Sequence, residues 1–191
     1  MDRLRACLPI AAKRYAWNIR YGLFGYPQLA PPEDAIHYLS ARMSESASIL
    51  ELGCGRGSLL HGLRKTGWAG SYCGVDMSKQ AIHDARKCAD QRSSWIISNF
   101  ESFRSPFMWD IIAMIESIYY VKLREIPIFL NGVMGMLTES GVVLIRFHDF
   151  NKHQKYVEAV QGFYTDTKRV SPNLLCVGRS MREPVTEPQP R

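Results

Sequence analysis

Glycines recur at every second position directly after a short apolar run: Gly53, Gly55 and Gly57. A glycine-rich turn between a strand and a helix lets the backbone bend tightly, and the helix that follows presents free N–H groups to a ligand. Glu51 lies two positions before the first glycine, and Asp76 ends the next apolar run. A carboxylate at that second position can accept hydrogen bonds from a ribose diol. The spacing therefore predicts a site for a nucleotide-like ligand.

Two other interpretations of the glycines remain open at this point. The dinucleotide fingerprint GxGxxG of dehydrogenases requires Gly or Ala three residues after Gly55, where this chain has Ser58. That position weakens the dehydrogenase hypothesis. In the second interpretation, the glycines form an ordinary strand-to-helix turn, Asp76 caps a helix, and neither binds a ligand.

Short apolar runs alternate with helical patterns from Ser48 onward, which is typical of βαβ units around a parallel sheet. Parallel strands are expected at 48–52, 71–75, 94–97, 110–115 and 142–147, the last of them after the turn signal at 139–141. Two more strands, 163–170 and 174–179, are joined by Ser171-Pro172-Asn173. So short a connection permits only an antiparallel pair.

The composition restricts the classes of protein to be considered. The chain has 191 residues, of which 46% are hydrophobic and 22% are charged, as is usual for one globular domain. The net charge of +6 is spread, with an excess of two in residues 1–46, one in 47–150 and three in 151–191. Diffuse charge of this kind makes nucleic acid an unlikely partner.

The sequence also bears on compartment and metals. No apolar run approaches the roughly 20 residues of a membrane-spanning helix. The five cysteines show no zinc-ligand spacing, and they are expected to be reduced. We therefore expect a cytoplasmic protein without a metal, as a monomer or homodimer.

The glycine signature 51–57, Asp76 and the segment 109–116 match the motifs of class I S-adenosylmethionine-dependent methyltransferases in order and spacing. The chain resembles this family over roughly residues 46–180. Segments 94–103 and 116–120 are also weakly similar to NodS-like N-methyltransferases that act on amino sugars. The resemblance implies an α/β fold, a Rossmann-like three-layer sandwich whose mostly parallel seven-stranded sheet ends in an antiparallel C-terminal hairpin. It also implies S-adenosyl-L-methionine as cofactor and S-adenosyl-L-homocysteine as product.

The composition and the resemblance together divide the chain into three expected parts. Residues 1–46, rich in aromatic side chains, are expected to form a helical N-terminal cover, with one helix running from Pro31 to about Met43. Residues 47–180 are expected to form the cofactor-binding methyltransferase domain. Residues 181–191 are expected to form a flexible tail, because prolines recur there and forbid regular structure.

Family motifs assign a set of residues to the cofactor: Glu51, Gly53, Cys54, Gly55, Gly57, Asp76, Met77, Asn99, Phe100 and Ile115. The resemblance implies that Glu51 and the glycines face the methionine part, Asp76 the ribose hydroxyls and Met77 the adenine ring. The family usually has an aspartate after the third strand to accept from the adenine amino group. This chain has Asn99, which can still accept through its side-chain oxygen but carries no charge.

Other side chains are candidates for the methyl acceptor. Glu116, Tyr119 and Tyr120 follow the fourth strand, at the edge where open α/β sheets bind ligands. His148 follows the fifth strand as a candidate base. Glu116, Tyr119 and His148 are the candidate catalytic residues, and Tyr120 lies on the acceptor side. Structural roles for the tyrosines and the histidine are the alternative.

Aromatic side chains of the N-terminal segment are candidates for a lid. Trp17 and Tyr21 could cover the cofactor. Packing of these rings over a sheet edge is the alternative.

The resulting hypothesis is a methyltransferase that transfers a methyl group to nitrogen or oxygen of a small molecule by in-line displacement, with nitrogen slightly preferred. Orientation and exclusion of water supply most of the acceleration in such a reaction, so no nucleophilic side chain is required. An RNA or protein methyltransferase is one alternative. A cofactor-binding regulatory protein without turnover is another.

Overall fold

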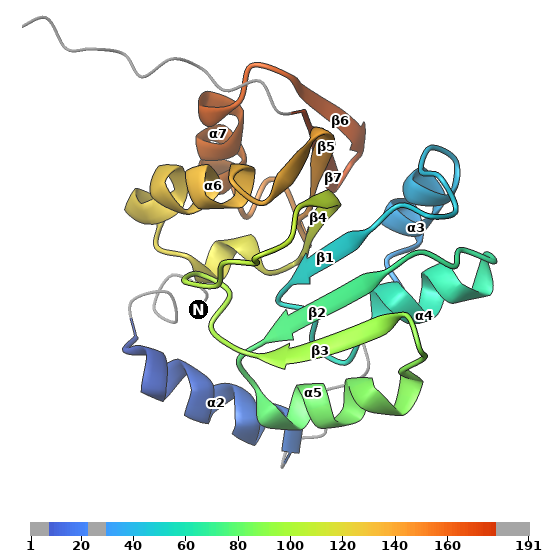
Figure 1. Cartoon of the computed structure of the whole chain (residues 1–191). Coiled ribbons are helices and arrows are strands. Elements are labelled where there is room, and N and C mark those ends of the chain that lie inside the picture. The colour runs from blue at the N-terminus through green and yellow to red at the C-terminus, as the bar shows by residue number, and fades with distance from the viewer. Residues whose placement is uncertain (1–7, 23–29, 179–191) are drawn as a thin grey trace, which may run out of the picture.

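A computed structural model describes residues 8–22 and 30–178 of the chain. Their strands form one seven-stranded sheet in the order β3-β2-β1-β4-β5-β7-β6 (Figure 1). The strands are β1 (Ile49–Leu52), β2 (Tyr72–Asp76), β3 (Ser93–Ile97), β4 (Trp109–Ile115), β5 (Leu137–Arg146), β6 (Thr167–Ser171) and β7 (Leu174–Val177).

Strand pairing confirms the predicted architecture. β1 pairs in parallel with β2 and with β4, and the parallel arrangement continues to β3 on one side and β5 on the other. β7 is antiparallel to both β5 and β6. The strand order reverses at β1, and open α/β sheets bind ligands at the carboxyl ends of the strands beside such a reversal.

Helices cover both faces of the sheet (Figure 1). α6 (Ile126–Met134) and α7 (Gln154–Phe163) pack on one face, and α3 (Glu33–Ser40), α4 (Ser58–Lys65) and α5 (Lys79–Ala85) pack on the other. Short 3₁₀ turns lie at Arg86–Cys88, Ile118–Tyr120 and Leu123–Glu125. α2 (Ile10–Gly22) lies beside α5, where the Ser78 hydroxyl donates to the Asn18 side chain over 2.9 Å.

Burial on both faces explains the apolar runs of the central strands. Every residue of β1 and of β2 is buried, so these strands lack the alternation of a half-exposed strand. β3 lies at the sheet edge, and Ile96 and Ile97 are exposed there.

The structure moves the boundaries of two predicted strands. β5 begins at Leu137 rather than Val142, because the predicted turn at 139–141 is an irregularity within the strand. The register jumps there from Trp109↔Leu137 to Ile111↔Val142. Residue 163, predicted to begin a strand, ends α7 instead, and β6 begins only at Thr167.

One indole ring shapes the packing beneath the glycine turn. A Cβ atom on Gly57 would lie 2.6 Å from Trp95 Cη2, and one on Gly74 would lie 2.7 Å from Trp95 Cε3. Real Cβ atoms do not approach other heavy atoms so closely. Glycine at both positions therefore makes room for this ring, which is buried under α5.

Some expectations lie outside the described residues: residues 1–7 and 23–29 of the expected N-terminal cover, the tail at 181–191, and Arg179, the last residue of the strand predicted at 174–179. In the ranges that the structure describes, we find no helix with the length and apolar character needed to cross a bilayer.

Candidate functional site

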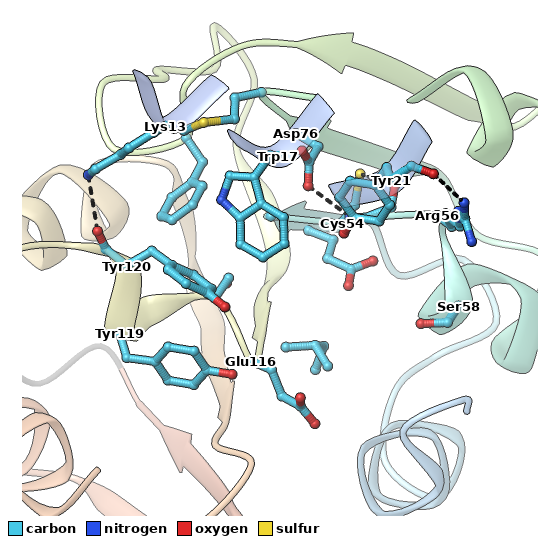
Figure 2. A pocket seen from close by; sticks show the side chains of 17 residues that line it. Lys13, Trp17, Tyr21, Cys54, Arg56, Ser58, Asp76, Glu116, Tyr119 and Tyr120 are labelled. Carbon is cyan, nitrogen blue, oxygen red and sulfur yellow. Dashed lines mark hydrogen bonds between the residues drawn. The ribbon is translucent and has the colours of Figure 1, made fainter. Parts of the chain in front are cut away.

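A cleft opens at the carboxyl ends of β1, β2 and β4 (Figure 2). It encloses about 880 Å³, its open mouth included. Its walls come from α2, the glycine turn and the residues that follow β2, β3 and β4: Lys13, Trp17, Tyr21, Glu51, Gly53, Cys54, Gly55, Arg56, Ser58, Asp76, Met77, Phe100, Ile115, Glu116, Ser117, Tyr119 and Tyr120. This edge of the sheet is where a nucleotide-like ligand was predicted.

The glycine turn is held tightly against the ends of the neighbouring strands. Gly53 has φ +83°, and a Cβ atom there would lie 2.6 Å from Ser117 Cβ. The Ser117 hydroxyl donates to the Leu52 carbonyl over 2.6 Å, and the Gly53 N–H donates to the Val75 carbonyl over 2.8 Å. Only glycine combines this backbone angle with so close an approach at position 53.

Asp76 ends β2 and lies at the cleft beside the glycine turn. Its two carboxylate oxygens accept hydrogen bonds from the backbone N–H groups of Gly55 (3.0 Å) and Ser78 (2.8 Å). Burial raises the pKa of Asp76, although these N–H groups and that of Met77 oppose the rise. A carboxylate has about four lone-pair positions, so Asp76 keeps capacity to accept from a ligand.

Glu51 is an acid within the buried strand β1, and it forms part of the cleft wall. The Tyr72 hydroxyl donates to its Oε2 through a short hydrogen bond. Burial raises the pKa of Glu51 to about 8, although the tyrosine hydroxyl lowers it, and the nearby Asp76 carboxylate raises it further. This carboxyl therefore holds a proton at neutral pH in the ligand-free protein.

Helix α2 closes one side of the cleft. Lys13 is buried, and its ammonium lies 2.7 Å from Glu101 Oε1 and donates to the Tyr120 carbonyl over 3.2 Å. The Trp17 ring packs edge-on against Tyr120, with 5.1 Å between centroids. Farther along the helix, Arg56 donates to the Tyr21 carbonyl over 3.0 Å. α2 thus contacts both the glycine turn and the segment after β4 (Figure 2).

Two apolar side chains come from the segments that follow β2 and β3. Met77 and Phe100 form part of the wall, and both are buried. Asn99 is buried but does not belong to the wall, and its Oδ1 accepts from the Glu101 N–H over 3.3 Å. Asn99, predicted to accept a hydrogen bond from the adenine amino group, thus stabilises a local turn in this structure.

Glu116 lies in the cleft wall, and a line of charged groups that are not part of the wall continues from it. Arg146 binds Glu116 Oε1 through one nitrogen and Asp34 Oδ1 through another, the latter over 2.8 Å. Asp34 Oδ2 also accepts from the Ser171 hydroxyl over 2.8 Å. His148 Nδ1 lies 3.9 Å from Glu116 Oε2, and its side chain is 68% exposed. One guanidinium is therefore shared by two carboxylates.

Tyr119 and Tyr120 belong to the 3₁₀ turn that follows Glu116. The Tyr119 ring stacks on the buried His153, with 4.1 Å between centroids and 9° between planes. Tyr119 is itself mostly buried and still reaches the cleft wall. The predicted structural role and the predicted acceptor role are thus compatible for this residue.

Most of the predicted site residues come together in this one cleft. The exceptions are Gly57, which packs under Trp95, Asn99, and His148, which lies behind Glu116 rather than in the wall. Sequence reasoning missed Lys13, Arg56, Ser58 and Ser117. The last three lie within or next to the motifs, so proximity to the motifs could have indicated them.

Comparisons with known proteins agree with this geometry. The family model described as a methyltransferase domain matches residues 24–169. The protein-lysine N-methyltransferase EFM4 of Saccharomyces cerevisiae is 26% identical over an alignment of 131 residues, and the alignment covers 59% of this chain and 56% of that protein. The chain thus spans about half the length of this curated relative.

Solved structures share the fold. The plantazolicin methyltransferase BpumL, in complex with a pentazolic desmethylPZN analogue and S-adenosylhomocysteine, superposes with a TM-score of 0.61 at 16% identity, covering 83% of this chain and 66% of BpumL. Coclaurine N-methyltransferase, bound to N-methylheliamine and S-adenosylhomocysteine, gives 0.50 at 17% identity, covering 60% of this chain and 35% of that one. The family match extends over most of the chain and confirms the resemblance stated from the motifs. The chain belongs to the family of methyltransferase-domain proteins.

Proposed function

We propose that the chain binds S-adenosyl-L-methionine and transfers its methyl group to nitrogen or oxygen of a small-molecule acceptor by in-line displacement. The observation that carries this proposal is the shared cleft. The glycine turn and Asp76 border it on one side, and Glu116 and Tyr119 border it at the other end. A cofactor beside the glycine turn and an acceptor beside Glu116 and Tyr119 can thus lie within reach of each other.

The residues of the cleft fit this cofactor chemically. Asp76 has lone pairs left for ribose hydroxyls, and Met77 and Phe100 offer apolar surface to a purine ring. Glu51 contributes a buried carboxyl that suits the amino group of the methionine part. The cofactor, when bound, supplies a methyl group activated on a sulfonium sulfur.

The chain's own contribution is orientation and exclusion of water. Positioning of two reactants is worth on the order of 7–11 kcal/mol in favourable intramolecular cases, so methyl transfer needs no covalent catalysis by a side chain. Trp17 and Tyr120 wall the cleft against solvent, and Glu116 and Tyr119 are the polar groups placed to orient the acceptor.

A protein lysine is the second candidate acceptor. Its support is the similarity to a protein-lysine N-methyltransferase at 26% identity. Both candidates are amines if nitrogen is the acceptor atom, so they share chemistry at the cleft. We also propose a cytoplasmic location, since the described cysteines Cys54, Cys73, Cys88 and Cys176 are all free. A monomer or homodimer stays the expected oligomeric state.

Calorimetric titration of the purified chain with S-adenosylmethionine and S-adenosylhomocysteine tests the cofactor. We expect binding of both, and a strong loss of affinity in Asp76→Ala. Asp90→Ala is the matched control, because this acid pairs with Arg64 on the exposed surface away from the cleft. Absence of binding by the wild-type chain would refute the proposal.

Mass spectrometry of the reaction products then identifies the class of acceptor. Amine and hydroxyl metabolites, and lysine-containing peptides, are incubated with the cofactor and examined for a methyl increment. A metabolite product supports the small-molecule proposal, and a product on peptides alone favours the second candidate.

A further inference from the structure

We propose that Asp34, Arg146 and Glu116 form an anionic subsite that binds the acceptor as an alkylammonium ion, with His148 as the exit for its proton. This inference rests on the proposed function, because it concerns the acceptor side of the same cleft. It names the chemical class of the acceptor and adds Asp34 and Arg146 as residues that determine specificity.

The backbone of Glu116 is the first observation. Glu116 has φ +54°, and it is the only non-glycine residue with a positive φ in the described parts of the chain. Such a conformation strains a residue that has a Cβ atom, and glycine would adopt it freely. A side chain retained under this strain, in the wall of a ligand cleft, indicates that the carboxylate itself is needed there.

The charge balance is the second observation. Glu116 and Asp34 contribute two negative charges, and the single guanidinium of Arg146 lies between them. The cluster therefore carries a net charge of about −1. The side chains of Glu116 and Arg146 are only 17% and 20% exposed, so water screens this charge incompletely. A cation entering from the cleft neutralises it.

Asp34 is held ionised by its surroundings. Burial alone would raise its pKa, but the Ser171 hydroxyl, the Arg146 guanidinium and the Ala35 N–H together lower the pKa of Asp34 below its ordinary value. Because Asp34 remains charged, Arg146 cannot be devoted to Glu116 alone. Asp34 is thus a positioning residue that keeps the Glu116 carboxylate available to the acceptor.

His148 provides a path for the proton. Its Nδ1 lies 3.9 Å from Glu116 Oε2, whereas Arg146 binds Oε1, and its side chain is mostly exposed. Imidazole groups exchange protons near neutral pH. The other charged groups around Glu116 are Arg146 from β5 and, through it, Asp34 from α3.

The balanced step is as follows. The acceptor ammonium gives one proton by way of Glu116 and His148 to solvent. The freed nitrogen lone pair forms a bond to the methyl carbon as the bond from that carbon to the sulfonium sulfur breaks, and the electron pair of that bond remains on sulfur. The products are a methylated ammonium and an uncharged thioether. A neutral hydroxyl acceptor gains little from this subsite.

Binding without turnover is the first test. An alkylamine, here 1,5-diaminopentane, is titrated calorimetrically into the chain saturated with S-adenosylhomocysteine. Loss of a charge-assisted hydrogen bond, worth about 1.5–3 kcal/mol, predicts at least a roughly tenfold weaker amine affinity in Glu116→Gln. Asp34→Asn should weaken amine binding several-fold, since Arg146 then pairs with Glu116 alone.

The control removes one negative charge elsewhere. Glu139 lies in the irregular part of β5 and is exposed. The Glu139→Gln variant should therefore bind the amine with the affinity of the wild type. Each variant must bind S-adenosylhomocysteine normally. Amine binding that is equal in Glu116→Gln, Asp34→Asn and Glu139→Gln overturns the subsite. Failure of the wild type to bind S-adenosylhomocysteine instead contradicts the proposed function.

Turnover distinguishes the source of the amine and tests His148. Free diamines and a lysine-containing peptide are compared as substrates, and methylation of either one supports an alkylammonium site. In His148→Ala we expect the pH dependence of kcat to shift while the amine KM stays nearly constant. An unchanged pH profile overturns the proton path, and exclusive methylation of hydroxyl compounds overturns the subsite.

Discussion

The Tyr72 hydroxyl of β2 donates a hydrogen bond to the Glu51 carboxyl of β1, and both residues are buried within the sheet. The two residues lie diagonally across paired strands, since Ile49 is the register partner of Tyr72. The relationship places an acid whose pKa is about 8 at the inner wall of the cofactor cleft.

Glu51 should make stability of the ligand-free chain depend on pH. Its folded pKa of about 8 exceeds the ordinary 4.5, so the folded state binds more protons than the unfolded state between these values. The contribution of Glu51 protonation to the free energy of unfolding is complete below about pH 4.5 and is lost as pH rises through about 8. The free energy of unfolding falls over this range by at most ~1.4 kcal/mol per pH unit. Denaturant unfolding from pH 5 to 9 should show this decline in the wild type and a smaller one in Glu51→Gln.

Tyr72→Phe provides the matched comparison. Without the hydroxyl, the pKa of Glu51 should rise further, because the hydrogen bond from Tyr72 lowers it. The decline in stability should then extend to higher pH. Parallel stability curves for the wild type, Glu51→Gln and Tyr72→Phe would contradict the assignment.

Gly53→Ala should damage the cleft more than its backbone angle alone explains. Gly53 and Gly67 both have strongly positive φ, of +83° and +88°. An added Cβ atom meets Ser117 in the first case and open space in the second. Gly67→Ala should therefore cost about 1–2 kcal/mol of unfolding free energy, which is the backbone strain, and Gly53→Ala clearly more. Chemical denaturation measures both, and equal losses would show that the contact with Ser117 is easily relieved.

Lys13→Met should loosen helix α2. The Lys13–Glu101 ion pair is nearly buried, and removal of one partner leaves the other charge without it. Trypsin cleavage at Arg14 and Arg20 should become faster. Lys87→Met removes a pair whose lysine is 66% exposed, so it should change little.

The double variant Lys13→Met/Glu101→Gln separates two explanations of that result. It should recover part of the protection against trypsin, since it leaves no uncompensated charge. Equal cleavage in the wild type and in Lys13→Met would show that the other contacts of α2 suffice to hold it.

Trp17→Ala should weaken cofactor binding. The ring packs against Tyr120 and Tyr21 at centroid distances of 5.1 and 5.7 Å, so its loss removes part of the cleft wall. We expect a roughly tenfold higher Kd for S-adenosylhomocysteine, which corresponds to about 1.4 kcal/mol. Tyr15→Ala is the control on the same helix, because Tyr15 is 70% exposed. Equal affinities of the two variants would assign Trp17 a packing role only.

The sequence was sufficient for features whose causes are local. Apolar runs predicted the central strands because burial on both faces leaves few polar positions in them, and the acids Glu51 in β1 and Asp76 in β2 both line the cleft. The short connection at 171–173 predicted the antiparallel hairpin, since two strands joined so closely cannot be parallel. The turn signal at 139–141 misled, because β5 accommodates those residues as an irregularity instead of ending there.

Features that depend on distant partners could not be predicted. Lys13 resembles an ordinary helix-surface lysine until α2 docks, and its partner Glu101 lies 88 positions away. Asp34 and Arg146 are separated by 112 positions, so no spacing rule connects them. His148 follows its strand as a candidate base would, but the side chain lies behind Glu116.

The Trp95 ring fits against Gly57 and Gly74. A substitution at any of these three positions therefore changes which residues the other two positions can tolerate. A larger residue at either glycine conflicts with the indole, and a smaller ring at position 95 would relieve that contact, although a Cβ atom at position 74 would still lie 2.9 Å from Cys54 Sγ and position 57 would keep its positive φ of +77°. Their effects on stability should therefore be non-additive, as expected for residues in direct contact. Among homologous chains, the residues at positions 57, 74 and 95 should covary. The conformation of the glycine turn therefore depends on which side chain the edge strand β3 carries at position 95.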